Sequence, residues 1–280
     1  NENIAPYTAT RIGLYHKSGK RKGFIPLGNL GFPTDLGKKL YSFGAVSDVH
    51  LGSSMGNDAS VDFQRALTFF NEIEKADFIC ACGDLTNFGT VAEFKNYKNH
   101  VDAYSPYTPV YAISGNHDAN DNYYQAETGA ITKNFDGIVP YTGKPLYYTF
   151  EQGNDLFVML GMSRWDYGYS NEDIFTGESI DWLETTLEAN KAKRVFLFQH
   201  ALRFDGCGKP YAGSPTADML KVPLGIRFKE IVSQYPNVIW FHGHSHMTFD
   251  SQEDNPKANY DRDFTCHSVH IPSLSSPREY

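Results

Sequence analysis

Five short motifs in this chain of 280 residues are rich in side chains that bind transition metals. They offer imidazoles, carboxylates and one carboxamide, the ligands that suit Zn, Mn or Fe. The five motifs are Asp48-Val-His50, Gly83-Asp84, Gly115-Asn116-His117-Asp118, His200, and Gly243-His244-Ser245-His246. Each motif is a weak signal when taken alone, because a single strand-end His or Asp-x-His is more often structural. Together, each after a short apolar run, they predict a metal centre.

Alternating strand and helix patterns run from residue 41 onward and place these motifs. Five short apolar runs predict strands, and one of the motifs follows each run. The runs cover 41–47, 77–82, 109–113, 194–198 and 237–241. Helical patterns cover 58–76, 90–104, 178–189 and 223–235. This alternation indicates a mainly parallel sheet covered by helices. Ligands bind such sheets beyond the carboxyl ends of the strands, so the motifs are expected to converge there.

The remaining segments are less regular. Runs over 147–151 and 155–161 predict a hairpin, 265–271 a further strand, and 119–146 a long loop with a short helix. Residues 11–27 predict strand, turn and strand. We therefore expect residues 1–40 to form a β-hairpin arm packed on a catalytic domain over 41–280, or to be the remnant of an upstream domain.

Composition narrows the class of protein and of partner. Hydrophobic residues make up 41% and charged residues 21% of the chain, which indicates a packed core. The net charge is -8, and no basic stripe exists beyond Lys17–Lys22, so a nucleic-acid partner is disfavoured. A small phosphate ester is not excluded, because bound cations supply local positive charge. No run of 18 apolar residues predicts a membrane span. Composition gives no oligomeric state.

Other features of the sequence yield weaker expectations. The four Cys are too few for a disulfide scaffold, and Cys80 and Cys82 are expected as buried thiols on one strand face rather than zinc ligands. The aromatic share of 15% could supply core volume or a substrate wall. The start at Asn1 without Met, with the N-terminal arm, favours a secreted or cell-envelope protein over a cytoplasmic one.

The order and spacing of the five motifs resemble those of the calcineurin-like metallophosphoesterases, over residues 41 to about 250. The resemblance implies a four-layer α/β/β/α sandwich, which periodicity alone does not predict. It also implies two divalent metal ions (Mn, Fe or Zn). By the resemblance, the ligands would be Asp48, His50 and His246 for the first metal, Asn116, His200 and His244 for the second, and Asp84 as a bridge.

Two cations suit phosphate-ester hydrolysis for a physical reason. Roughly 3.5–4 Å apart, they neutralise the charge that repels the nucleophile and acidify a bridging water into hydroxide. The resemblance gives His117 the role of protonating the leaving group or steadying the phosphoryl oxygens. Asp118 would then orient His117, as carboxylates often fix functional imidazoles.

Several residues outside the motifs are weaker candidates, each with a structural alternative. Arg203 could hold a phosphate by a bidentate contact, or lie on the surface. His242 could support the metal ligands, or be a buried hydrogen-bonded residue. Further candidates for contact with the site are Arg164, Trp165, His267, His270 and Arg278.

The function expected from these observations is hydrolysis of a small phosphomonoester or phosphodiester. Asn87 stands where purple acid phosphatases carry an iron-binding Tyr, so a tyrosinate-bound ferric site is disfavoured. No Gly-x-Ser-x-Gly elbow occurs, which disfavours a serine hydrolase. The alternative is a catalytically silent, metal-bound scaffold. Such relatives usually lose the acid His or several ligands, and this chain has all of them.

Overall fold

The computed structural model divides the chain into two compact units, residues 1–42 and 43–280. It describes residues 11–15, 21–26, 39–52, 59–119, 139–164, 173–202, 206–208, 218–247, 260–261 and 265–275. In the first unit, strands β1 (Arg11–Tyr15) and β2 (Arg21–Pro26) pair antiparallel, as the pattern over 11–27 predicts. The division into an arm over 1–40 and a catalytic domain over 41–280 stays a prediction.

The second unit contains two sheets. The smaller sheet is parallel, in the order β3 (Phe43–Val46), β4 (Phe78–Cys82), β5 (Val110–Ile113). The larger has six strands in the order β10 (Tyr260–Asp261), β11 (His267–His270), β9 (Val238–His242), β8 (Val195–Phe198), β7 (Asp155–Leu160), β6 (Tyr147–Gln152). Its four central strands are parallel, and its edge strands β6 and β10 are antiparallel to their neighbours.

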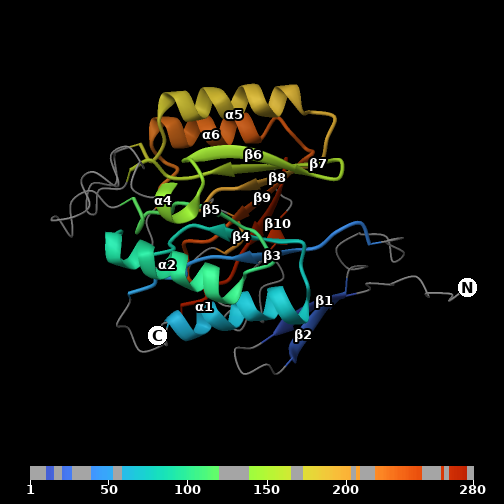
Figure 1. Ribbon diagram of the computed structural model, residues 1–280. Helices are drawn as coiled ribbons and strands as arrows, with labels where there is room; N and C mark the ends of the chain where they lie inside the picture. Colours follow the sequence, from blue (N-terminus) through green and yellow to red (C-terminus); the bar gives the residue numbers. More distant parts are fainter. Residues whose placement is uncertain are drawn as a thin grey trace, which may run out of the picture. The chain divides into compact units, whose positions relative to one another are not determined.

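Helices cover the outer faces of both sheets (Figure 1). The helices are α1 (Ala59–Thr68) with its π-helical continuation η2 (Phe69–Ile73), α2 (Val91–Tyr104), α4 (Val139–Thr142), α5 (Gly177–Ala189) and α6 (Pro223–Val232). Helices α5 and α6 lie over the six-stranded sheet, and α1 and α2 lie over the three-stranded sheet. This is the four-layer α/β/β/α sandwich that the family resemblance implies.

Phenylalanine rings fill the space between the two sheets. The ring of Phe43 on β3 lies 5.3 to 6.2 Å, between centroids, from four Phe rings of the larger sheet, among them Phe157 and Phe198. Alternate residues of a strand face opposite sides, so on β7 and β8 the Phe residues face the other sheet and the Leu and Val residues face the helices. Much of the high Phe content therefore forms core. Cys80 and Cys82 are buried thiols, as predicted.

The structure departs from the strand and helix pattern of the sequence in two places. The strands form two facing sheets rather than one, because both sets of strands present Phe side chains that bury one another. The helix predicted over 58–76 ends as a π-helical turn. The ring of Phe70 in this turn occupies the space beside Gly44, where a Cβ on the glycine would lie 2.7 Å from Phe70 Cγ. No helix among the described residues is long and apolar enough to cross a membrane.

Candidate metal centre

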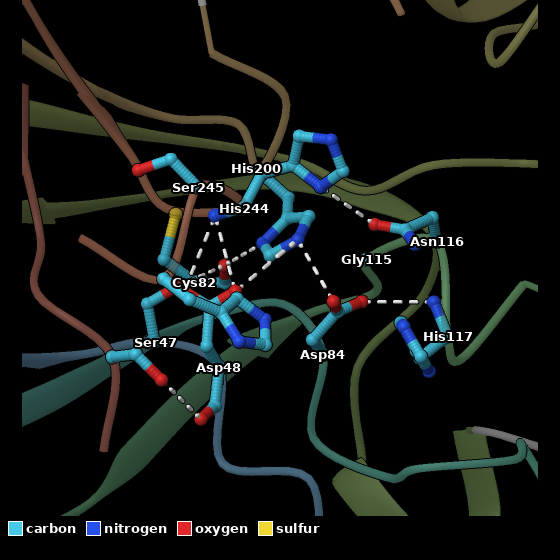
Figure 2. Close-up of polar contacts among 12 residues, drawn as sticks. Ser47, Asp48, Cys82, Asp84, Gly115, Asn116, His117, His200, His244 and Ser245 are labelled. Atoms are coloured by element: carbon cyan, nitrogen blue, oxygen red, sulfur yellow. Dashed lines mark hydrogen bonds and ion pairs between the residues drawn. The ribbon is translucent and has the colours of Figure 1, made fainter. Parts of the chain in front are cut away.

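The five predicted motifs meet at the carboxyl ends of β3, β4, β5, β8 and β9 (Figure 2). Their donor atoms form two groups, in each of which all atoms lie within 4.8 Å of one another. The first group is Asp48, His50, Asp84 and His246, and the second is Asp84, His200 and His244. Asp84 belongs to both. Asn116 joins the second group, with its Oδ1 3.0 Å from His244 Nδ1.

Several donor atoms in these groups are buried without a hydrogen bond. They are Asp84 Oδ2, His200 Nε2 and His244 Nε2, although the first two lie 3.2 Å from each other. The Nε2 atoms of His50 and His246 lie 2.9 Å apart. Burying polar atoms without partners is costly, and a cation would satisfy these lone pairs together. The residues present therefore fit bound transition metals.

Most of these ligand candidates have a strained backbone. Among the described residues, six other than glycine have positive φ, and five of them belong to the two donor groups: Asp48, His50, Asp84, His244 and His246. Such a conformation costs about 1–3 kcal/mol each and persists only where the surroundings impose it. The positive φ values belong to tight turns, which direct these side chains toward one point. A regular strand end would direct them to different places.

Hydrogen bonds across the two sheets fix the turn that carries His244. Its N–H donates to both carboxylate oxygens of Asp48, at 3.1 and 3.2 Å. Gly243 makes this approach possible, since a Cβ there would lie 1.9 Å from Ser47 Oγ and 2.5 Å from Asp48 Oδ2. On β8, the Nδ1 of His200 donates to the Cys82 carbonyl at 2.7 Å, which turns Nε2 toward the carboxylates.

His117 lies at the edge of this cluster. Its backbone N–H donates to Asp84 Oδ1 at 2.8 Å, and its ring Nδ1 lies 2.7 Å from the carbonyl oxygen of Asn87. The ring packs edge-on against His50, with centroids 4.5 Å apart. Because the carbonyl accepts from Nδ1, the nitrogen left to act on a substrate is Nε2.

Asp118 does not have the partner that the sequence predicts. Its carboxylate accepts from the N–H groups of Gly115, Leu85 and Thr86 at 2.9 to 3.0 Å, and from the Thr86 hydroxyl at 2.7 Å. The expectation that Asp118 orients the His117 ring is wrong. The carbonyl oxygen of Asn87 orients that ring instead. The physical reason is local: the turns after β4 and β5 expose N–H groups, and Asp118 joins both turns into one rigid unit.

Burial and mutual charge set the protonation of the cluster. Burial disfavours the anions of Asp48 and Asp84, but the neighbouring histidines, with His200 the strongest, together outweigh burial and hold the pKa of both carboxyls well below the usual range. Burial likewise opposes charge on His200, yet Asp84 and Asp48 raise its pKa to about 9. Burial, reinforced by the other imidazoles, lowers the pKa of His50 and of His244 to about 3.

The weaker sequence candidates have mixed outcomes. His242 is buried and lies 3.0 Å from the Ser268 hydroxyl, which fits its structural alternative. His267 contacts the Tyr260 hydroxyl, and Arg164 is exposed. His270 is buried against Ser245, inside the last motif. The candidates that lie outside the described residues are Trp165, Arg203 and Arg278.

Glu93 supports the site without having been predicted to do so. Its carboxylate accepts from the N–H groups of Phe88 and Thr90 and from the Thr90 hydroxyl, at 3.0 to 3.1 Å. It thereby holds the loop whose Asn87 carbonyl fixes His117. The signal was present in the sequence, because Thr90-x-x-Glu93 is a capping-box pattern at the start of a helix.

The four-layer sandwich, with carboxylates and imidazoles gathered at its strand ends, is a metallophosphoesterase fold. The chain belongs to the calcineurin-like phosphoesterase family, whose model matches residues 41–248. The grouping of donors around Asp84 coincides with the division that the resemblance implies, and the assignment of each residue to a metal remains a proposal.

Solved structures show the same fold. A purple acid phosphatase from yellow lupin (Lupinus luteus) seeds has a TM-score of 0.54 and 14% identity, over 82% of this chain and 43% of that one. The chain thus spans less than half of that phosphatase. GAP50, the anchor in the inner membrane complex of Plasmodium, has a TM-score of 0.50 and 14% identity, over 85% and 73% of the two chains. At this identity the likeness shows the fold alone. A comparison with curated protein sequences finds no match.

Proposed function

We propose that this chain is a dinuclear metal-dependent phosphohydrolase that cleaves small phosphomonoesters or phosphodiesters. The observation that supports it is the position of Asp84, whose carboxylate belongs to both donor groups. Its Oδ2 lies 3.6 Å from His50 Nε2 of the first group and 3.2 Å from His200 Nε2 of the second, so this carboxylate could serve two cations. A single structural metal would not need a second set of buried imidazoles around the same residue.

The residues proposed to hold the cations supply nitrogen and oxygen donors, which suit Mn, Fe or Zn. The first cation would be held by Asp48, His50 and His246, the second by Asn116, His200 and His244, and Asp84 would serve both. When bound, such a pair neutralises phosphate charge and acidifies water. The net charge of -8 repels a long polyanion. The positive charge of bound cations is local, and it would attract a small phosphate ester.

His117 is proposed to act on the leaving group. Its Nδ1 is tied to the Asn87 carbonyl, so its Nε2 can donate a proton to the departing oxygen or a hydrogen bond to the phosphoryl group. Asp118 contributes indirectly, by fixing the turns that carry Asp84 and His117. The predicted catalytic role of Asp118 is therefore replaced by a positioning role.

Replacing His117 by Asn tests this assignment. We expect turnover of bis-p-nitrophenyl phosphate with added Mn²⁺ to fall by about 10²–10⁴-fold, while two metals per chain remain bound. Metal analysis and phosphate-release kinetics over nucleotides, cyclic nucleotides and glycerophosphodiesters would measure both. The matched control is His100→Asn, since His100 lies on α2 and its ring nitrogen contacts its own helix at Asn96. Full turnover in His117→Asn would remove His117 from the mechanism.

The alternative is a metal-bound scaffold without catalysis. An anchor protein with this fold exists in GAP50, but identity of 14% carries no function to this chain. The presence of His117 beside the donor groups weighs against it, because a metal-bound scaffold without catalysis needs no proton donor next to its metals. No hydrolysis with Mn²⁺, Fe²⁺ or Zn²⁺, on both monoester and diester dyes, would favour the scaffold over the enzyme.

A further inference from the structure

The last described segment, 265–275, joins both sheets at the edge where the metal centre lies. Strand β11 runs parallel to β9 in the six-stranded sheet, with His270 opposite His242. A few residues later Ser273 forms a bridge with Ser47, at the end of β3 in the three-stranded sheet. The N–H of Ser275 donates to the carbonyl of Asp48 at 2.9 Å. This segment lies beyond the residues that the family model matches, which end at 248.

One side chain of this segment reaches the turn that carries two metal-ligand candidates. The Nε2 of His270 lies 2.9 Å from the Ser245 hydroxyl, and both side chains are buried. The same hydroxyl accepts from the N–H of Met247 at 3.3 Å. Ser245 stands between His244 and His246, whose φ values are +73° and +56°. The hydrogen bond therefore fixes the centre of a strained turn, which persists only if its surroundings impose it.

We propose that His270, acting through Ser245, is a positioning residue that holds His244 and His246 in the geometry needed to bind metal. The inference rests on the proposed function, because it concerns the same two cations. Its chemistry is that of partners that orient ligands without touching the metal, whose loss weakens metal affinity by about 10–100-fold. Burial lowers the pKa of His270 to about 4, so its ring is neutral at physiological pH and exchanges a hydrogen bond with Ser245 without adding charge.

Gly208 supports the inference from another part of the chain. A Cβ on Gly208 would lie 2.4 Å from Cδ2 and 2.9 Å from Cβ of His270, so only glycine leaves room for this imidazole. Gly208 has φ of +68°. Gly143 has φ of +67°, and a Cβ on it would meet no atom of the described residues within 4 Å. An alanine would therefore be strained equally at both positions, and the two positions differ in contact with His270.

Metal affinity of the whole chain tests the inference. We expect Ser245→Ala and His270→Ala each to weaken Mn²⁺ binding by about 10–100-fold, measured by calorimetric titration of metal-free protein well below its unfolding temperature. The double variant should be no weaker than either single variant, because one interaction is lost in all three. His270→Gln should recover much of the affinity, since its amide can also bond the hydroxyl. With Co²⁺, the visible absorption of the two alanine variants should change, reporting altered ligand geometry.

Two matched controls separate positioning from general loss of stability. Ser268→Ala removes a buried hydroxyl bonded to another buried imidazole, that of His242, at 3.0 Å. It should keep affinity close to that of wild type, as should Gly143→Ala, whereas Gly208→Ala should weaken binding. The inference is overturned if Ser245→Ala and His270→Ala bind Mn²⁺ like wild type, or if both controls lose as much affinity. If wild-type protein itself binds no metal, the proposed function fails instead.

Discussion

The two sheets contribute different chemistry to the metal centre. The three-stranded sheet supplies both carboxylates, Asp48 and Asp84, and the carboxamide of Asn116. The six-stranded sheet supplies only imidazoles, those of His200, His244 and His246. The negative charge of the site therefore lies on one sheet, and all of its candidate imidazole ligands except His50 lie on the other. Bound cations would connect the two.

The two sets of ligands are also held in different ways. On the three-stranded sheet, Asp118 ties the turns after β4 and β5 to each other through backbone N–H groups, so these ligands form a unit of one sheet. On the six-stranded sheet, the His244 turn is held by Asp48 of the other sheet and by His270 of strand β11. The turns after β4 and β5 are thus joined within one sheet, whereas the His244 turn also needs a contact from the other sheet.

The sharpest test of this difference compares Asp84 with His246. Asp84→Asn should lower the metal content from two ions per chain to almost none. It should also reduce phosphoesterase activity by more than about 100-fold, which exceeds the loss caused by removing a residue that only orients a ligand. His246→Asn should remove mainly one ion, because His246 belongs to one donor group. Metal analysis after dialysis measures both. Retention of two ions by Asp84→Asn would contradict the shared role.

The aromatic layer between the sheets gives the next largest effect. Phe157 is fully buried and packs against Phe43, Phe78 and Phe196. Phe157→Ala should lower the free energy of unfolding by about 3–5 kcal/mol. If the rings and not the cations hold the sheets together, urea unfolding should show the same loss with metal and with EDTA. A loss confined to the metal-loaded protein would show instead that the metal centre joins the sheets.

The sequence predicts the candidate ligands from local patterns. An apolar run followed by a candidate ligand can be recognised without knowing what lies opposite, and β3, β4, β5, β8 and β9 end within one residue of the predicted positions. The two-sheet fold was predicted from the family resemblance, because the sequence pattern of a single helix or strand does not show which sheet faces which. Facing sheets depend on which Phe residues meet, and those residues are far apart in the sequence.

The supporting contacts could not be predicted for the same reason. His270 and Ser245 are 25 residues apart, and Asp118 bonds Leu85 across 33 residues. The motif Asn116-His117-Asp118 suggests that neighbours in sequence act on each other, but the turn after β5 directs the Asp118 carboxylate toward the turn after β4 instead. Residue types thus indicated what the centre is made of, while tertiary contacts decide what holds it in place.

Proton release on metal binding is the finest test of the contrast between carboxylates and imidazoles. In metal-free protein, His200 of the six-stranded sheet faces Asp84 and Asp48 of the other, which raise its pKa to about 9 against the effect of burial. It therefore carries a proton at pH 7 to 8, while burial holds the pKa of His50 and His244 at about 3 and leaves them neutral. A metal ligand must be deprotonated. Loading should thus release about one proton per chain, and affinity should rise about tenfold per pH unit until pH 9.

The same shift fixes the sign of a stability effect. Since the pKa of His200 is raised from 6.5 to about 9 on folding, its contribution to metal-free stability is complete below pH 6.5 and is lost as pH rises through 9. Metal-bound protein should not show this loss, because the proton has already left. Calorimetry in two buffers of different ionisation enthalpy counts the proton, and unfolding with and without EDTA from pH 6 to 9.5 follows the stability. A metal affinity that does not change between pH 7 and 9 would mean that Asp48 and Asp84 do not keep the His200 imidazole protonated.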